Sequence, residues 1–343
     1  MHMRLFFFTG IFLGLFFVPL AWTSAQVLPT LGSVEINLTP EHPQPGQLVQ
    51  ATISSASESV RAASIVWLLN DRVELEGPGE VSFSFRAGKA GSTQTVGVLM
   101  RTTSGQVLAN TLTLQPAQVT LLWEADTYTP PFYQGRSLYS SGSLIRAEAI
   151  AEFIDSSGNT YDPSKLIYTW SKNGTVIGGI SGVAASSIVT EGPKFLGNYI
   201  LAVEVQAPDG TQVALSAARI QTTEPIIKLY ERDPLIGVMY HTAVSTDHIF
   251  SGSSQFEVHA SPFFMATQHA NASSLNYTWQ VNGTRVFGDG DTPAELTLQL
   301  SGQDSLRTRI RVAVAHVQHL LQAGEETFAV GFEGSARESL FGF

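Results

Sequence analysis

The chain has 343 residues, of which 43% are hydrophobic and 14% are charged, with a net charge of −10 and no cysteine. This length suits two or three domains, and the hydrophobic content is enough for each to bury a core, so wholesale disorder is excluded. The acidic balance argues against a nucleic-acid partner. The lack of cysteine excludes disulfides, zinc–thiolate sites and thiol nucleophiles.

Residues 1–25 predict a signal peptide. A short basic start, 1–4, precedes an apolar run, 5–20, and the small residues Thr23 and Ala25 suit cleavage after Ala25. An uncleaved membrane anchor is the alternative, because the run is near the lower length limit for spanning a bilayer. We therefore expect an exported protein of the cell surface, periplasm or extracellular space, in contact with a membrane only if this segment is retained.

Residues 27–117 predict the first domain. The proline-rich segment 38–46 suits an edge strand and its turn rather than a helix. Val49, Ala51 and Ile53 then alternate with polar residues, which indicates a strand with one apolar face. Further strands are expected at 64–69, 81–85, 96–100 and 107–114.

Two more domains are predicted at 118–223 and 224–332, followed by a short tail at 333–343. The segment 122–126, Leu-Trp-Glu-Ala-Asp, matches 229–233, Leu-Tyr-Glu-Arg-Asp, so these two domains look more alike than either does to the first. Strands and turn signals recur throughout, and a sustained apolar period of 3.6 residues is lacking beyond the signal segment. The sequence therefore predicts an all-β fold.

A motif with a central tryptophan occurs once in each predicted domain, at 64–73, 166–176 and 275–286. Each copy has an alternating strand, then Asn-Gly or Asn-Asp, then a returning strand, which is the pattern of a β-hairpin. The alternation places Trp67, Trp170 and Trp279 on the inward face, so we expect each to lie in the core of its own β-sandwich.

These residues resemble the immunoglobulin-like domains of bacterial surface proteins, a broad group that includes PKD and fibronectin type III modules. The inward tryptophan on the presumed third strand carries the resemblance, together with a late apolar strand at a similar distance in each copy. Tyr199 resembles the tyrosine corner of such domains, with Leu201 where a cysteine would lie. The resemblance implies three tandem immunoglobulin-like sandwiches over nearly the whole mature chain and is nearly silent on function.

Two acidic pairs are candidate Ca²⁺ ligands, Glu124 with Asp126 and Glu231 with Asp233. Residues two apart on a strand face the same way, and both pairs lie just after a predicted domain boundary. The alternative is a solvated acidic edge that discourages strand addition, because no full shell of oxygen ligands is visible. No other cofactor is expected.

No catalytic set is recognisable in the sequence. Ser, His and Asp are present without a motif that positions a nucleophile, and no glycine-rich phosphate loop occurs. His316 and His319 are an odd number of residues apart, so on a regular strand they would face opposite ways and could not bind one metal ion together.

The expected function is non-enzymatic: an exported spacer or adhesive scaffold whose partners are other envelope proteins or surface glycans. The alternative is a glycan- or peptide-binding module that uses the aromatic insertion 128–139 of domain two and its counterpart 235–240 of domain three. Exposed aromatic side chains there would favour binding, whereas burial against the neighbouring domain would favour the spacer.

Overall fold

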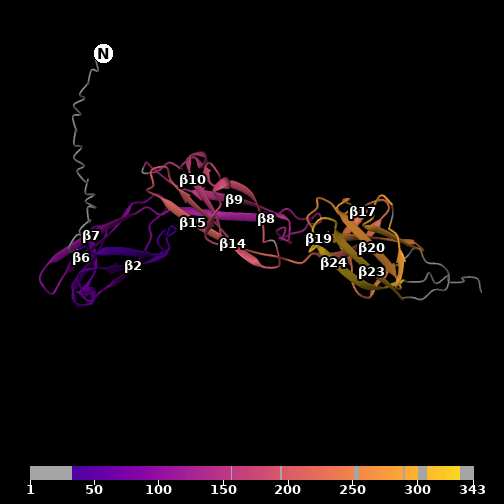
Figure 1. The fold of residues 1–343 in the computed structure, drawn as a ribbon, viewed down its shortest axis with the longest axis horizontal. Coiled ribbons are helices and arrows are strands. Elements are labelled where there is room, and N and C mark those ends of the chain that lie inside the picture. Colours follow the sequence, from indigo (N-terminus) through magenta and orange to yellow (C-terminus); the bar gives the residue numbers. More distant parts are fainter. Residues whose placement is uncertain are drawn as a thin grey trace, which may run out of the picture.

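The computed structural model describes residues 33–155, 157–193, 195–250, 255–288, 290–299 and 307–332. The predicted signal peptide and the tail at 333–343 lie outside these residues. The described chain forms strand-rich units that follow one another in a row (Figure 1). Its helices are the single turns Val60–Ala62, Pro163–Lys165 and Gly178–Ile180. None of the described helices is long and apolar enough to cross a bilayer.

Domain one consists of two antiparallel sheets. The first contains β1 (Glu35–Thr39), β2 (Leu48–Ser54) and β5 (Ser82–Arg86), in the order β1-β2-β5. The second contains β3 (Ser64–Leu69), β4 (Arg72–Pro78), β6 (Gln94–Arg101) and β7 (Val107–Leu114), in the order β4-β3-β6-β7.

Domain two repeats this plan. One sheet has the order β13-β9-β8, from β8 (Gln118–Ala125), β9 (Leu144–Glu152) and β13 (Ser187–Glu191). The other has the order β11-β10-β14-β15, from β10 (Ile167–Lys172), β11 (Thr175–Val176), β14 (Asn198–Gln206) and β15 (Val213–Gln221). The short strand β12 (Gly182–Val183) also pairs with β10.

Domain three adds two strands to the plan. One sheet has the order β17-β16-β19-β22, from β16 (Ile226–Asp233), β17 (Gly237–Val244), β19 (Gln255–Phe263) and β22 (Glu295–Gln299). The other has the order β18-β24-β23-β20-β21, from β18 (His248–Phe250), β20 (Leu275–Val281), β21 (Thr284–Val286), β23 (Arg307–His316) and β24 (Ala323–Phe332). Thus β17 and β18 extend one sheet each, and β18 pairs with β24 in parallel.

The shared strand order identifies the fold. Without the added strands, the first, second and fifth strands of each domain form one sheet, and the third, fourth, sixth and seventh form the other. This is the arrangement of immunoglobulin-like and fibronectin type III sandwiches. The chain is therefore an all-β tandem repeat of immunoglobulin-like domains, as the sequence predicted.

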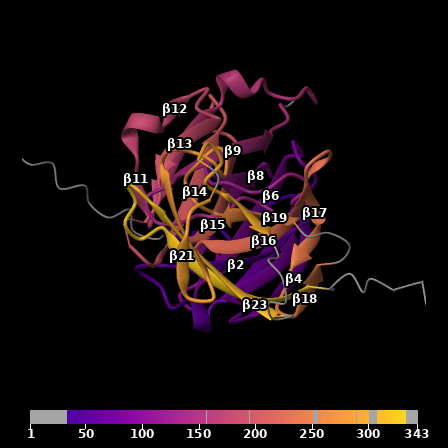
Figure 2. The ribbon, with the colours of Figure 1, turned by 90° about the vertical axis from the view of Figure 1, so that its right-hand side faces the viewer.

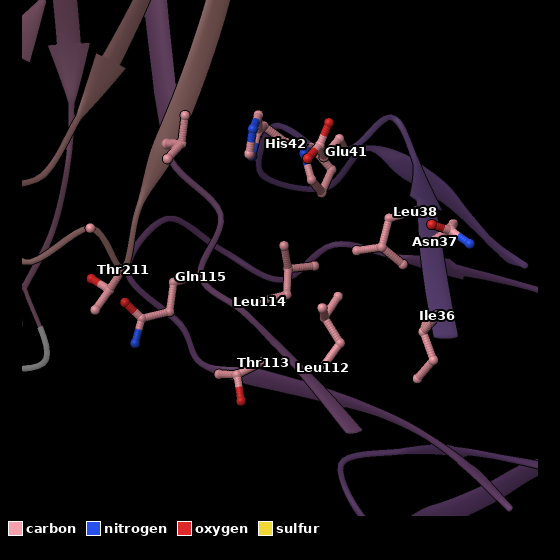
Figure 3. A pocket seen from close by; sticks show the side chains of 13 residues that line it. Ile36, Asn37, Leu38, Glu41, His42, Leu112, Thr113, Leu114, Gln115 and Thr211 are labelled. Atoms are coloured by element: carbon pink, nitrogen blue, oxygen red, sulfur yellow. The ribbon is translucent and has the colours of Figure 1, made fainter. Parts of the chain in front are cut away.

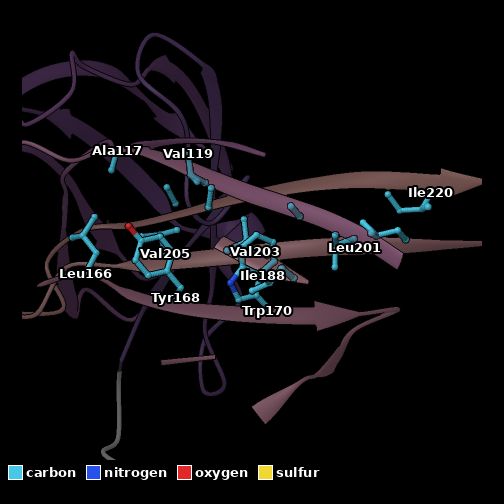
Figure 4. Close-up of a cluster of buried hydrophobic side chains, with 14 of the residues drawn as sticks. Ala117, Val119, Leu166, Tyr168, Trp170, Ile188, Leu201, Val203, Val205 and Ile220 are labelled. Carbon is cyan, nitrogen blue, oxygen red and sulfur yellow. The ribbon is translucent and has the colours of Figure 1, made fainter. Parts of the chain in front are cut away.

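The three central tryptophans are fully buried, each in a separate hydrophobic core. Figure 4 shows Trp170 between strands of domain two. Each indole Nε1 donates to a backbone carbonyl two residues before the fifth strand, in the opposite sheet: Trp67 to Glu80 at 2.8 Å, Trp170 to Ala185 at 2.8 Å and Trp279 to Pro293 at 3.0 Å. Each tryptophan thus joins its two sheets by packing and by a hydrogen bond.

The hairpin after each tryptophan also repeats one geometry. Asn70, Asn173 and Asn282 all have φ of 50°, a left-handed conformation that asparagine tolerates well. In domain two, Asn173 donates its backbone N–H to the carbonyl of Ile200 at 2.9 Å, and its Oδ1 accepts from the N–H of Ile200 at 2.9 Å. Asn70 makes the same two bonds with Thr95, and Asn282 with Arg309.

Tyr199 lies on β14 and is almost fully buried in the core of domain two. The Lys172 ammonium lies 4.4 Å from the centre of its ring. Its hydroxyl has no hydrogen-bond partner within the described residues, whereas the hydroxyl of a tyrosine corner bonds to the backbone. The resemblance to a tyrosine corner therefore extends to position but not to the hydrogen bond.

Candidate functional site

The connection between β8 and β9, residues 126–143, leaves domain two and packs against domain three; we call it the docking loop. Tyr128 donates its N–H to the carbonyl of Met265 at 2.8 Å, and its own carbonyl accepts from the N–H of Phe264 at 2.8 Å. The Tyr128 side chain is buried in a small cluster with Ala270, Ala294 and Tyr277. Tyr128 thus links the two domains through its backbone and through its side chain.

A second link lies in the turn between β23 and β24. Gln322 is fully buried; its Nε2 donates to the carbonyl of Ser141 at 2.8 Å, and its Oε1 accepts from the N–H of Ala266 at 2.8 Å. Beside it, a Cβ on Gly142 would come within 2.6 Å of Nδ1 of His319. Domains two and three are therefore packed too closely for a side chain at position 142.

Four tyrosines gather where the docking loop meets domain three. The rings of Tyr230 and Tyr240 lie 5.2 Å apart at 64°. Burial raises the pKa values of Tyr230, Tyr240 and Tyr277, and the neighbouring Tyr128 raises them further. The hydroxyls of Tyr230, Tyr240 and Tyr277 are therefore neutral at ordinary pH and do not act as phenolate bases or ligands.

A charged network lies beside the tyrosines. Glu295 approaches Arg232 at 3.3 Å and Nδ1 of His259 at 3.6 Å, and Arg232 also pairs with Glu257 at 2.5 Å. Burial lowers the pKa of His259, and within the described residues neither ring nitrogen makes a hydrogen bond. Arg232 is thus shared between the two carboxylates, and His259 is neutral near pH 7.

A groove of about 540 Å³ runs between the docking loop and the β16–β17 hairpin; we call it the junction groove. Residues 130–134 of the loop form one wall, and Tyr230, Ile236, residues 238–241 and Phe263 form the rest. These lining residues include no Asp, Glu, Lys or Arg, in a chain of net charge −10. The structure thus brings together the two aromatic insertions that the sequence singled out.

The rim of the groove exposes large apolar side chains. Phe132 is 91% exposed and Ile236 is 74% exposed, and Leu235, next to Ile236 in the chain, is 94% exposed. Phe132 and Phe264 also have φ of 66° and 64°, a strained conformation for a bulky residue. Strain of this kind persists only where the surrounding structure imposes it, and it is found most often at functional sites.

The candidate Ca²⁺ ligands are not brought together. Asp126 lies 3.5 Å from Arg146 and accepts from Nε2 of Gln268 at 3.2 Å. Glu231 pairs with His248 at 2.5 Å, and Asp233 accepts from the N–H groups of Leu235 and Ile236. Glu124 lies on an exposed position of β8. The described residues contain no group of three or more carboxylate or histidine side chains placed for a metal ion. Of the two alternatives drawn from the sequence, the acidic edge is therefore the one that we carry forward as a prediction for a calcium titration.

The expectation that His316 and His319 face opposite ways is wrong, because β23 ends at His316 and the following turn returns His319 to it. Their ring centres lie 4.4 Å apart. Nδ1 of His316 accepts from the N–H groups of Gln318 and His319, so its proton is on Nε2, which donates to the carbonyl of Ala266 at 3.1 Å. Both nitrogens of His316 are engaged, which leaves none for a metal.

A second groove, of about 410 Å³, lies where domains one and two meet (Figure 3). Leu38, His42 and residues 112–115 of domain one line it together with Thr211 of domain two. Nearby, a Cβ on Gly91 of domain one would lie 2.6 Å from Ile154 of domain two. This junction is close-packed at Gly91, and its groove lacks the aromatic lining of the junction groove.

No family model and no curated protein matches the chain. Among solved structures it is similar to three N-terminal domains of the bacteriophage RB49 outer capsid protein Hoc (14% identity, 88% of this chain, 98% of that chain, TM-score 0.24). It is also similar to the central fibronectin-III array of RIM-binding protein (11% identity, 87% of this chain, 97% of that chain, TM-score 0.30). A third similar structure is Bacteroides ovatus SGBP-B in complex with a mixed-linkage heptasaccharide (11% identity, 88% of this chain, 70% of that chain, TM-score 0.23). At such values the similarity assigns no function.

Proposed function

We propose that this chain is a non-enzymatic, exported protein of the cell envelope whose tandem domains act as a structural spacer and interaction scaffold. The observation that carries the proposal is the docking loop, because it is hydrogen-bonded to domain three at Asp126, Tyr128 and Ser141. Tyr128 makes two backbone hydrogen bonds across the boundary, Gln322 makes one to Ser141, and both residues are buried. Such contacts hold two domains in one orientation, which a spacer needs.

Short connections support the same proposal. Domain one ends at Leu114 and domain two begins at Gln118, while domain two ends at Gln221 and domain three begins at Ile226. Connections of three and four residues leave little freedom between sandwiches. The export signal predicted at 1–25 supports a place outside the cytoplasm.

The absence of catalysis is part of the proposal. Ser261 and His259 lie two residues apart on β19, but both are buried. The carboxylates Glu257 and Glu295 pair with Arg232 and so do not face a substrate cavity as a free acid–base pair. These contacts suit a structural network rather than a reacting site.

The spacer proposal is tested by measuring the distance between domains two and three in the full mature chain. Because the chain has no native cysteine, spin labels can be attached at Thr120→Cys and Thr284→Cys, both exposed positions. We expect a narrow distance distribution from pulsed electron paramagnetic resonance. A broad distribution in the otherwise unaltered protein would contradict a rigid spacer.

A matched pair of variants separates junction packing from backbone strain. Gly142→Ala places a Cβ against His319 at a φ of +91°, whereas Gly158→Ala adds the same atom at a φ of +84° in open space. Both changes are strained for an alanine. We expect only Gly142→Ala to broaden the distribution, and equal behaviour of the two would show that the contact with His319 does not order the domains.

A further inference from the structure

His316 lies at the end of β23, just before the turn in which Gln322 links domain three to domain two. Figure 2 looks along the row of domains from the domain-three end, with β23 in the nearest sandwich. Across the sheet His316 is paired with the apolar Leu275 of β20, and its ring centre lies 4.4 Å from that of His319. His316 is buried. A titratable side chain therefore lies in the interior, close to the junction of two domains.

Both ring nitrogens of His316 hold backbone groups. Nδ1 accepts from the N–H groups of Gln318 and His319 at 3.1 Å each, which ties the turn to the end of the strand. Nε2 donates to the carbonyl of Ala266 at 3.1 Å, in the segment that follows β19. These partners fit one protonation state, the neutral ring with its proton on Nε2.

The residues that His316 holds are also contacts of domain two. Ala266 donates its N–H to Oε1 of Gln322, whose Nε2 donates to a carbonyl of the docking loop. His319 faces Gly142 so closely that a Cβ there would lie 2.6 Å from its Nδ1. The neutral ring of His316 therefore supports the side of domain three that the docking loop contacts.

A second proton on His316 is incompatible with these contacts. It would sit on Nδ1 and point at two N–H donors, so both hydrogen bonds would be replaced by repulsion. It would also place a charge in a buried site, which is costly without a partner. Among the described residues, the histidines that pair with a carboxylate are His248 and His259. The charged form of His316 therefore requires the turn to move.

Three titratable side chains line a cleft of about 410 Å³ beside this contact: Asp126, His269 and His319. The carboxylate of Asp126 belongs to the docking loop and already lies 3.5 Å from Arg146. The two histidines are either neutral or positively charged, so they cannot balance a positive ring. These groups therefore offer His316 no free negative charge.

His259, the other buried histidine with a lowered pKa in domain three, differs in this respect. Its ring nitrogens form no hydrogen bond among the described residues, and its Nδ1 lies 3.6 Å from Glu295. A proton on His259 thus breaks no hydrogen bond and gains a carboxylate partner. The hydrogen bonds to the turn and to Ala266 depend on His316 instead.

Acidification favours release of the His316 ring. Burial lowers the pKa of His316 below its ordinary value of 6.5, and His319 lowers it further, while the bond to Ala266 opposes the shift. A ring released into water regains the ordinary value, so the open form takes up a proton first as the pH falls below 6.5. One proton changes the balance by up to about tenfold per pH unit, until the docked form also protonates.

We propose that His316 is a pH-sensitive switch of the junction between domains two and three. Its neutral ring holds the turn against the docking loop, and its protonation on mild acidification releases that contact while both sandwiches stay folded. The proposal rests on the proposed function, because it makes the spacer rigid at neutral pH and flexible at acidic pH.

The spin labels at Thr120→Cys and Thr284→Cys test the switch in the full mature chain. We expect one narrow distance distribution at pH 7.5 and a second, broader component at pH 5.0 that disappears when the sample is returned to pH 7.5. A distribution that is broad at both pH values would contradict the proposed spacer. A distribution that is narrow at both would overturn only the switch.

His316→Asn separates titration from hydrogen bonding. The amide oxygen of asparagine can take the place of Nδ1 and accept from the two turn N–H groups, but the amide does not titrate in this range. We expect a narrow distribution at both pH values in this variant. A second component at pH 5.0 that persists without the imidazole would overturn the proposal.

Nitrogen-15 NMR of the histidine-labelled, otherwise unaltered chain provides a measurement that does not depend on how this variant folds. Protonation of Nδ1 of His316 should follow the same pH dependence as the second distance component. A ring that is still neutral at a pH where that component has formed would overturn the proposal.

Two matched variants locate the titrating group. His319→Gln keeps the ring of His316, so the opening should persist and begin at a higher pH, because His319 lowers the pKa of His316. A junction that no longer responds to pH would assign the switch to His319 and overturn the proposal. His269→Gln changes an exposed histidine of the same cleft and should leave the opening unchanged.

Hydrogen exchange distinguishes opening from unfolding. At pH 5.0, relative to the intrinsic exchange rates at each pH, we expect protection to fall in the turn 317–322 and in the docking loop, and to remain in β20. Loss of protection throughout domain three would mean that acid unfolds the domain, which would overturn the switch.

Discussion

The Nε2 of Gln322 lies 2.8 Å from the backbone oxygen of Ser141, although the two residues belong to different domains. The other end of the same amide accepts from Ala266, so one buried side chain satisfies groups on both sides of the boundary. A buried amide with both ends bonded is a directional contact, unlike apolar packing. The Gln322 amide therefore stabilises the junction and also fixes the relative position of the two domains.

Removing this amide should loosen the junction without unfolding either sandwich. Gln322→Ala leaves the carbonyl of Ser141 and the N–H of Ala266 without this partner, at a cost of about 1–3 kcal/mol. We expect faster hydrogen exchange at Ala266 and in the docking loop, and unchanged exchange in β10 and β14. Uniformly faster exchange throughout domain two would contradict a local role.

The repeated asparagine turns should contribute to stability through both conformation and hydrogen bonding. Asn173→Gly keeps the left-handed backbone accessible but loses the bond from Ile200 to Oδ1, which should cost about 1 kcal/mol. Asn173→Ala loses the bond and adds backbone strain, which should cost about 1 kcal/mol more. Equilibrium denaturation measures both variants, and equal losses would show that the conformation contributes nothing.

The indole hydrogen bond can be separated from aromatic burial. Trp170→Phe leaves the carbonyl of Ala185 unpaired and opens a cavity, so we expect a loss of about 2–4 kcal/mol in unfolding free energy. Trp123→Phe is the control, because Trp123 is only partly buried and is stacked by Arg136 at 3.9 Å. Its loss should be about 1 kcal/mol or less. If chemical denaturation gave similar losses of unfolding free energy for the two variants, the role of the hydrogen bond would be contradicted.

Domain three should lose stability on mild acidification. Burial lowers the pKa of His259 below 6.5 despite the nearby Glu295, and burial with the neighbouring His319 lowers that of His316. As the pH falls through 6.5, the unfolded chain therefore takes up protons before the folded domain does, which favours unfolding. The loss levels off once the folded histidines also protonate.

Melting temperatures between pH 8 and pH 5 test this behaviour. His259→Leu removes one titrating group and should flatten the pH dependence, although it alters the contacts of Glu295 and Arg232. His42→Gln is the control, because His42 is exposed in domain one. A pH profile that is unchanged in the His259 variant would place the effect elsewhere.

Calcium is expected to have little effect. Asp126, Glu231 and Asp233 each have a partner in the protein, so a cation would have to displace Arg146, His248 or the backbone N–H groups of a turn. Melting temperatures should be unchanged by millimolar Ca²⁺ relative to the same concentration of Mg²⁺. A rise specific to Ca²⁺ and abolished by Asp126→Asn would establish a site after all.

The central hairpins could be predicted from the sequence because their signals are local. The alternation around Trp170 defines an inward face, and Asn173-Gly174 defines the turn. The same reasoning could not reveal β17 and β18. The segment that contains them has no Asx-Gly hairpin turn. β18 pairs with β24, which is distant in sequence, and β17 pairs with β16, whose spacing to the next strand differs from that in the other domains.

The junction was beyond sequence reasoning for a different reason. Tyr128 and Phe264 meet because two domains are placed side by side, and no periodicity within either domain encodes that placement. The returning turn that joins His316 to His319 was missed because strand alternation was extended past the end of β23. One available signal was the docking loop itself, whose prolines and aromatic residues suit a buried contact more than a solvated connection.

The docking loop also has a consequence for the order in which the chain matures. Residues 126–143 are synthesised before all of domain three, yet Tyr128 is covered by residues of domain three such as Tyr240, Ala270 and Tyr277. A nascent chain that has completed β15 therefore presents bare aromatic surface until more than a hundred further residues emerge and fold. A chain truncated at the end of domain two would keep this aromatic surface exposed to other proteins.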